Sequence, residues 1–182
     1  MEIRRVKKHD VDMTSGSVFR HLLNFAVPLL MGNIFQQLYN TVDTWVVGNY
    51  VSNEAFSAVG TVAPIINTLI GAFSGLASGA GVVISQYYGA GKYDRVKDAV
   101  HTAVMMTLVL SVAFTAIGIA MTPNMLRLMK TPAEVFPQSR AYLYIYFSGM
   151  AGLMLYNMGA GILRAVGDSK RPFYYLVCAA VI

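Results

Sequence analysis

Charged residues are scarce in this sequence. Asp, Glu, Lys and Arg make up 13% of its 182 residues, about half the share found in an ordinary soluble domain. A helix needs about 20 residues to cross the hydrocarbon core of a bilayer, and a soluble helix of that length normally has a charged face. Four stretches of at least that length contain no charged residue: Leu22–Val42, Ala55–Gly91, Ala99–Leu126 and Ala141–Leu163. The sequence therefore predicts four membrane-spanning helices.

Cysteine and histidine are also sparse. Cys178 is the only cysteine, which excludes an internal disulfide and favours a small packing residue within an apolar run. The three histidines share no metal-ligand spacing, so no metal site is predicted. The motifs of soluble enzymes are missing as well, since Gly91 and Lys92 are not followed by the Ser or Thr of a phosphate-binding loop. We therefore expect neither an enzyme nor a bound cofactor.

The apolar stretches and the turns between them predict an all-α, polytopic transmembrane helix bundle. A charged cytoplasmic tail, residues 1–13, is expected to precede one bundle of residues 14–182. Thr131 and Glu134 match a capping box, which predicts that a helix restarts there and that Pro137 bends it into the fourth span. The expected spans are about 18–47, 53–88, 95–121 and 138–164, with a partial fifth at 172–182. Because that last apolar run is short, we expect the chain to be the N-terminal piece of a longer protein.

The basic residues are distributed unequally between the two sides of such a bundle. With four spans, eleven of the 14 Lys and Arg residues fall on the side of the N-terminus. Only Arg127, Lys130 and Arg140 fall on the other side, and the loop Gly48–Phe56 has none. Short basic loops stay in the cytoplasm, so the N-terminus is expected on the cytoplasmic side of the plasma membrane. This arrangement does not favour a nucleic-acid partner.

Two rows of small or weakly polar residues predict close helix packing. Gly71, Gly75 and Gly79 follow one another at four-residue spacing in the second span. Helix association in lipid depends on close approach of backbones, which bare glycine faces permit. Thr107, Ser111 and Thr115 form a similar row in the third span, and we expect that row to face neighbouring helices.

A polar stripe on the first span is the main candidate for a functional site. Asn33, Gln36, Asn40 and Asp43 fall within roughly an 80° arc of one helix face. Asp43 is the only carboxylate of the first expected span, and such acids usually face a cavity or a partner because their exposure to lipid is costly. Pro28 predicts a kink in the same helix. The alternative is that Asp43 lies near the outer interface and only bonds to a neighbour.

Three polar side chains outside the first span complete the candidates: Asn67 on the second span, and Tyr156 and Asn157 on the fourth. For these we expect hydrogen bonds between helices rather than contact with a substrate.

Several short segments of this sequence resemble the multidrug and toxic compound extrusion (MATE) family. The resemblance extends over nearly all of residues 14–182. It rests on Pro28 and Gln36 and on three motifs: Asp43-Thr-Trp-Val-Val-Gly48, Gln86-Tyr-Tyr-Gly89-Ala-Gly91 and Leu163-Arg164-Ala-Val-Gly167-Asp168.

This resemblance implies a twelve-helix transporter of two six-helix lobes, which exports cationic or amphipathic compounds in exchange for protons or sodium ions. The chain would form most of the N-terminal lobe, with the C-terminal lobe as its partner. Asp43 matches the family's ion-coupling acid and Pro28 its hinge. Gln36, Asn40 and Asn157 match polar neighbours in the cavity of that lobe.

Two other functions stay open at the level of sequence. A lipid-linked precursor flippase of the same superfamily would need fixed cations for a pyrophosphate, and Leu22–Val42 and Ala55–Gly91 contain no Lys or Arg. A membrane-embedded enzyme or a non-transporting subunit would need catalytic groups at membrane depth, where only Asp43 is available.

Overall fold

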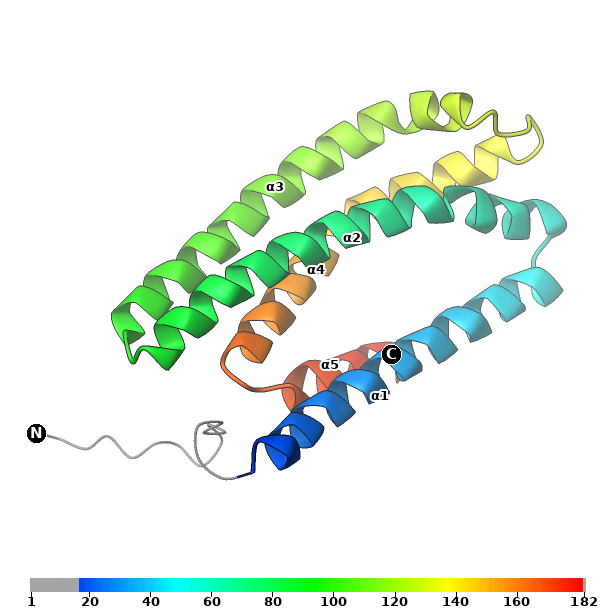
Figure 1. The fold of residues 1–182 in the computed structure, drawn as a ribbon. Helices are drawn as coiled ribbons and strands as arrows, with labels where there is room; N and C mark the ends of the chain where they lie inside the picture. The colour runs from blue at the N-terminus through cyan, green and yellow to red at the C-terminus, as the bar shows by residue number, and fades with distance from the viewer. Residues whose placement is uncertain (1–16, 182) are drawn as a thin grey trace, which may run out of the picture.

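The computed structural model describes residues 17–181, and every regular element among them is an α-helix. The expected all-α fold is therefore confirmed. The tail of residues 1–13 lies outside the described residues. The helices, shown in Figure 1, are α1 (Val18–Tyr50), α2 (Asn53–Gly89), α3 (Tyr93–Leu128), α4 (Phe136–Ala165) and α5 (Lys170–Val181).

Side-chain caps determine where α2 and α5 begin. The Ser52 hydroxyl accepts a hydrogen bond from the backbone N–H of Ala55 at 3.1 Å, which satisfies one of the unpaired donors at a helix start. The expected start of α2 at residue 53 is confirmed. One oxygen of Asp168 accepts from the backbone N–H groups of Lys170 and Arg171, each at 3.1 Å. Gly167 has φ 88°, which permits the tight turn before this cap.

Two predictions about the connection between α3 and α4 were wrong. The third helix does not end at residue 121 but continues through Pro123 to Leu128, because Leu126 is fully buried in the core and offsets the lost backbone bond. The capping box also fails. The Thr131 hydroxyl has no hydrogen-bond partner among residues 17–181. Val135 is the N-cap residue, and Pro137 lies in the first turn of α4.

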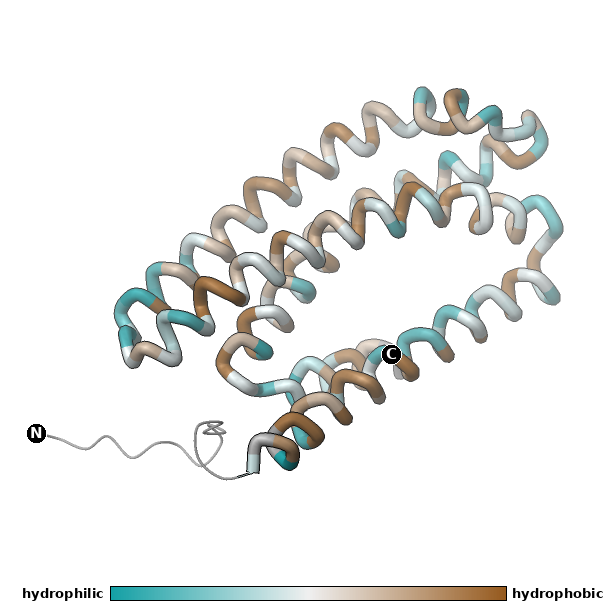
Figure 2. The backbone as a smooth tube through the Cα atoms, in the orientation of Figure 1, coloured by the Kyte–Doolittle hydropathy of each residue, from teal (hydrophilic) through white to brown (hydrophobic). Residues whose placement is uncertain are grey.

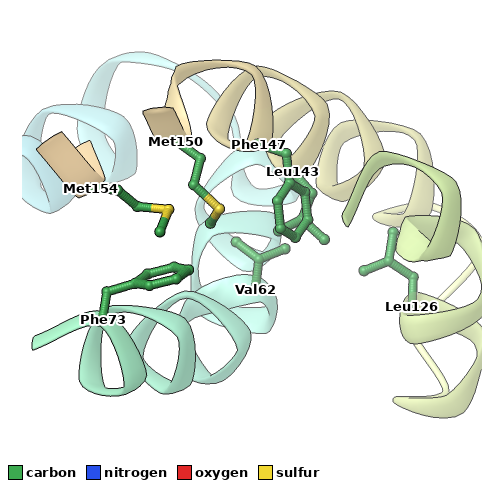
Figure 3. Packing of buried hydrophobic residues seen from close by; sticks show 7 residues of the cluster. All are labelled: Val62, Phe73, Leu126, Leu143, Phe147, Met150 and Met154. Carbon is green, nitrogen blue, oxygen red and sulfur yellow. The ribbon is translucent and has the colours of Figure 1, made fainter. Parts of the chain in front are cut away.

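The core of the molecule lies between α2, α3 and α4. In Figure 3, four side chains of α4 meet Val62 and Phe73 of α2 and Leu126 of α3. Met150 and Met154 are unbranched, so they fill the irregular space above the Phe73 ring. Phe73 also meets Phe114 edge to face, with ring centroids 5.0 Å apart. These contacts hold the three helices together as one bundle.

The polar row on α3 faces the other helices, as expected. Thr107 and Ser111 are buried, and each hydroxyl donates to a carbonyl of the same helix. The Thr115 hydroxyl donates across to the carbonyl oxygen of Phe147 on α4 at 3.1 Å. One turn later Gly118 lies directly under the Phe147 ring, where a Cβ atom would overlap the ring. The α3–α4 contact therefore requires glycine at position 118, which has no side chain.

The glycine row on α2 does not provide close packing within the described residues. Gly71, Gly75 and Gly79 are exposed, and no atom lies within 4 Å of the position that a Cβ would take on any of them. The close approach lies on another face of α2, where a Cβ on Gly161 of α4 would be 3.1 Å from the carbonyl oxygen of Ala77. Close packing at this glycine row stays a prediction, because four-residue spacing marks a face without indicating which neighbour covers it.

α1 and α5 lie apart from the three-helix bundle. α5 runs alongside α1, as Figure 1 shows, and Phe173 of α5 packs over Gly32 of α1. Among the described residues α1 has few contacts with α2 and none between its backbone and those of α3 and α4. A short turn joins this pair to the bundle at each end.

Length and composition mark α2 and α3 as helices that could cross a membrane. α1 and α4, with 33 and 30 residues, are also longer than the roughly 20 residues that a span requires. α1 differs from α2 and α3 in hydropathy, because its later half mixes hydrophilic and hydrophobic residues (Figure 2). The polar side chains of α1, rather than its length, separate it from α2 and α3.

Candidate functional site

The later half of α1 exposes nearly all of its polar side chains. Asn33, Gln36, Asn40 and Asp43 are exposed on the surface of the described structure. α1 is one continuous helix through Pro28, so these side chains keep the helical spacing that the sequence predicts. They do not, however, all face the same surroundings.

A groove with a volume of about 630 Å³ lies between the end of α1 and the start of α2. We call it the α1–α2 groove. Its lining combines carboxamides and hydroxyls with two aromatic rings and contains no charged side chain. The lining residues are Gln37, Asn40, Thr41, Thr44, Trp45, Gly48, Asn49, Asn53 and Phe56.

The hydrogen bonds within α1 leave acceptors facing this groove. The hydroxyls of Thr41 and Thr44 donate to the carbonyl oxygens of Gln37 and Asn40, each at 2.8 Å. The Asn49 amide donates to the Trp45 carbonyl, also at 2.8 Å. Because the two hydroxyl hydrogens are already used, the hydroxyl oxygens remain as acceptors, whereas the carboxamides of the lining offer both donors and acceptors. The groove therefore offers acceptor oxygens and no fixed positive charge to a ligand that donates hydrogen bonds or is cationic.

The aromatic wall of the groove depends on a glycine. A Cβ on Gly48 would be 3.2 Å from the Phe56 ring, closer than nearly all real contacts, so glycine lets the ring of α2 lie against α1. Trp45 is exposed and meets Tyr50 edge to face at 5.8 Å. Trp45 and Phe56 thus present two π-faces beside the acceptor oxygens, a combination that attracts organic cations.

Asp43 does not line the α1–α2 groove. It is close enough to Tyr142 of α4 for an electrostatic interaction, as is Tyr39 one turn earlier on α1. Tyr142 interacts in turn with Tyr146, whose hydroxyl is buried without a hydrogen-bond partner among the described residues. One helix, α1, therefore carries the lining of the groove and, outside that lining, an acid that interacts electrostatically with α4.

The other predicted site residues are divided between these surroundings. Asn40 lines the groove, whereas Asn33 and Gln36 do not. Asn157 is half-buried on α4 and donates to the Leu153 carbonyl of its own helix at 2.9 Å, so the structure does not bring it to α1. The expected bond between helices belongs to its neighbour, since the Tyr156 hydroxyl donates to the Pro172 carbonyl of α5 at 3.2 Å.

Among the residues that line the groove, sequence reasoning identified only Asn40 as a site residue. Gln37, Thr41, Thr44 and Gly48 recur at helical spacing on α1, a signal that could have identified this second polar face. Tyr142 was not identified as a candidate from the sequence. Its interaction with Asp43 depends on how α1 and α4 are placed in the fold, and no local sequence pattern predicts that placement.

Comparison with known proteins gives one consistent family. The family model MatE matches residues 28–182. The probable multidrug resistance protein YoeA of Bacillus subtilis is 38% identical over 166 residues, which cover 91% of this chain and 36% of that protein. The chain thus spans little more than a third of the length of this relative.

The fold also matches two solved conformations of a MATE protein. The structure in the straight conformation matches with a TM-score of 0.84 and 25% identity, over 95% of this chain and 38% of that one. The structure in the bent conformation matches with a TM-score of 0.82 and 25% identity, over 91% and 37%. The five helices are therefore arranged as in the first part of these larger proteins.

Proposed function

This chain belongs to the MatE family of multidrug efflux transporters, and from that membership we propose that it forms most of the N-terminal lobe of a cation-coupled drug exporter. The remaining part of the transporter, with a second lobe, would complete the pathway. The substrates would be cationic or amphipathic small molecules, and the coupling ion a proton or sodium. Like other family members the protein would be a multi-pass protein, here of the plasma membrane.

The observation that carries this proposal is the chemistry of the α1–α2 groove. It offers acceptor oxygens and two aromatic rings without a fixed positive charge. Cations are attracted to such rings by about 0.5–2 kcal/mol each, and a pyrophosphate would find no cation in the lining. The groove therefore supports an exporter of cations over a flippase of lipid-linked pyrophosphates.

Asp43 is proposed as the ion-coupling group. It lies on the same helix as the groove, does not line it, and interacts electrostatically with Tyr142 of α4. Binding of a proton or sodium ion at Asp43 would change the charge between α1 and α4. A ligand shifts a conformational equilibrium only by its differential affinity for the two forms, and this change of charge supplies such a difference.

Pro28 is proposed as the point where α1 changes shape. An interior proline removes one backbone hydrogen bond, so the helix bends there at lower cost than elsewhere. A protein of this fold has been solved in a straight and a bent conformation, which supports two forms for this chain as well. Bending at Pro28 would move Asp43 together with the α1 side of the groove, because both lie on the later part of α1.

The experiment is transport of a fluorescent cationic dye by the intact transporter in membrane vesicles. An imposed pH gradient and an imposed sodium gradient are applied separately, which identifies the coupling ion. With Asp43→Asn we expect gradient-driven transport to fall at least about tenfold, the effect of losing a charge interaction of about 1.4 kcal/mol. Dye binding without a gradient should be retained, since Asp43 does not line the groove.

The matched control is Asp94→Asn, which removes the same charge from an exposed position at the start of α3. This variant should transport normally. Full gradient-driven transport by the Asp43→Asn protein would remove Asp43 from the mechanism, while the assignment of the family would stand.

A further inference from the structure

A second groove lies at the opposite end of α2 from the α1–α2 groove, between the last turns of α2 and the first turns of α3 (Figure 1). We call it the α2–α3 groove. Its volume is about 340 Å³. The greater part of its lining is apolar, with Ala80 and Val83 from α2 and Ala103 and Met106 from α3. The proposed transport mechanism makes no use of it.

Two opposite charges lie in this groove without pairing. Arg95 and Asp98 both line it, one helical turn apart on α3. Within the part of the chain that the structure describes, neither forms an ion pair or a side-chain hydrogen bond, although nearby Lys97 pairs with Asp94 at 3.9 Å. Tyr87 and Thr102 add two hydroxyls to the same lining. The groove thus presents a cation, an anion and hydroxyls to a single ligand.

The place of the groove along the chain puts these charges at the level of lipid headgroups. The uncharged stretch Ala55–Gly91 ends just before them, so the apolar lining lies at membrane depth and the charged lining at its edge. Tyr88 and Tyr93, with ring centroids 5.9 Å apart, lie at the same turn, as is typical of the membrane–water interface.

We propose that the α2–α3 groove binds one phospholipid with an ethanolamine headgroup. The lipid phosphate pairs with the Arg95 guanidinium, and the primary ammonium donates hydrogen bonds to the Asp98 carboxylate. One acyl chain lies along Ala80, Val83 and Met106. This proposal goes beyond the transport function and does not depend on it.

The charge pattern selects this headgroup over the two common alternatives. A phosphatidylglycerol could pair its phosphate with Arg95, but its uncharged glycerol headgroup offers no cation to Asp98. A phosphatidylcholine has the same charges as phosphatidylethanolamine, but its quaternary ammonium has no N–H to donate. Charge-assisted hydrogen bonds are about twice as strong as neutral ones, so the primary ammonium is preferred.

The test is native mass spectrometry of the intact transporter in detergent with one added lipid at a time. The probes are phosphatidylethanolamine, phosphatidylcholine and phosphatidylglycerol with identical oleoyl chains. We expect the wild-type protein to retain phosphatidylethanolamine about fivefold better than the other two, the size expected for one charged contact at a membrane surface. Equal retention of the three lipids, or highest retention of phosphatidylglycerol, would overturn the proposal.

Two charge-removing variants and their controls separate the roles of the two residues. Asp98→Asn should abolish the preference for ethanolamine, whereas Asp98→Glu, which keeps the charge, should retain it. Arg95→Gln should lower retention of all three phospholipids, because the phosphate is common to them. Asp94→Asn and Lys97→Gln alter charges of the same turn that do not line the groove, and they should bind lipid as the wild type does. An equal effect of Asp94→Asn and Asp98→Asn would contradict a specific site.

A measurement on the wild-type protein keeps the test decisive if a variant fails to fold. Stepwise N-methylation of the ethanolamine removes one N–H donor at a time and leaves the charge unchanged. Retention should fall along this series, with its lowest value at phosphatidylcholine. A flat series would show that Asp98 does not accept hydrogen bonds from the headgroup.

Discussion

At the scale of single residues, Trp45 and Phe56 determine what the α1–α2 groove can attract. Both rings line it among acceptor oxygens, and Trp45 is 57% exposed, so its face is available to a ligand. Indole has the strongest attraction for cations among aromatic side chains. The selectivity of the proposed exporter for cations should therefore depend on this residue more than on any carboxamide of the groove.

The first prediction is that Trp45→Leu raises the KM for a cationic dye about three- to tenfold, the loss of a cation–π contact of roughly 1 kcal/mol. A neutral dye of similar size should be affected less, and Trp45→Phe should retain part of the affinity. Initial rates of uptake into vesicles measure both KM values. Tyr50→Leu is the control, because Tyr50 contacts Trp45 but does not line the groove. An equal loss for neutral and cationic dyes would contradict the cation–π contribution.

The polar residues of α1 show what the sequence could and could not predict about the site. Their type and spacing follow from the chain, so Asn40 and Asp43 were recognised as candidates. Their surroundings do not follow from local sequence. Asn53 and Phe56 of the next helix complete the lining of the groove, and Asp43 interacts with Tyr142 of α4. Residues far apart in sequence complete the site, and periodicity within one helix does not identify them.

At the scale of elements, α1 combines a long uninterrupted helix with an interior proline. Among the described residues Pro28, Pro64 and Pro123 all lie inside helices. Only Pro28 lies in a helix that stands apart from the bundle, where bending does not disturb the core. The same residue type therefore has a different consequence in each helix.

The second prediction is that Pro28→Ala stabilises the straight form of α1, because it restores a hydrogen bond and removes a clash that together cost about 3 kcal/mol. Dye binding should be retained while the rate of gradient-driven export falls severalfold. Export rates in vesicles, with equilibrium dye binding on the same samples, separate the two effects. Pro64→Ala on α2 is the matched control and should leave the export rate unchanged. Wild-type export by the Pro28→Ala protein would exclude a hinge at this residue.

The third prediction concerns the packing of α3 on α4. Gly118→Leu would force the Phe147 ring out of its position, and overpacking of this kind costs about 1–3 kcal/mol. We expect a lower melting temperature for the purified transporter, measured by thermal denaturation in detergent. Gly75→Leu is the control, since open space surrounds Gly75.

Shortening the ring should relieve the clash at residue 118. The double variant Gly118→Leu with Phe147→Ala is therefore expected to recover part of the lost melting temperature. If Gly118→Leu and Gly75→Leu destabilise the protein equally, the ring contact is not responsible.

The helices illustrate which parts of the fold follow from local sequence. The start of α2 at residue 53 was predicted, and the structure shows a local cap there, since Ser52 and its target Ala55 are three residues apart. The end of α3 was not predicted, because Pro123 locally disfavours a helix. The packing of Leu126 against core residues of α2 and α4 overrides this local preference. The exposed glycine row of α2 makes the same point. A local signal locates the start of α2 but not that of α4, and packing determines the end of α3.

At the scale of the whole molecule, the charge asymmetry along the chain predicts how the bundle lies in the membrane. The basic turns after α2 and α4 lie at one end, and the uncharged turn between α1 and α2 lies at the other (Figure 2). Basic loops remain in the cytoplasm. Both basic turns, and with them the N-terminus, should therefore be cytoplasmic.

The fourth prediction tests this topology with reporter fusions. A fluorescent protein active only in the cytoplasm should fluoresce when fused after Lys92 or Asp168, and alkaline phosphatase should be active after Ser52 or Thr131. Each reporter at the other pair of sites is the control and should be silent. The opposite pattern would invert the orientation, and activity of both reporters at one site would contradict a single topology.

The pair formed by α1 and α5 is attached to the bundle at two distant points. Val51 and Ser52 join it to α2 at one end, and the turn before α5 joins it to α4 at the other. Asp168 strengthens the second attachment through its ion pair with Arg171 at 3.0 Å. A body fixed at two points keeps one rotational degree of freedom, about the axis that connects them. Such a rotation would change the separation of Asp43 and Tyr142 while every side chain of the α2–α4 core stays in place.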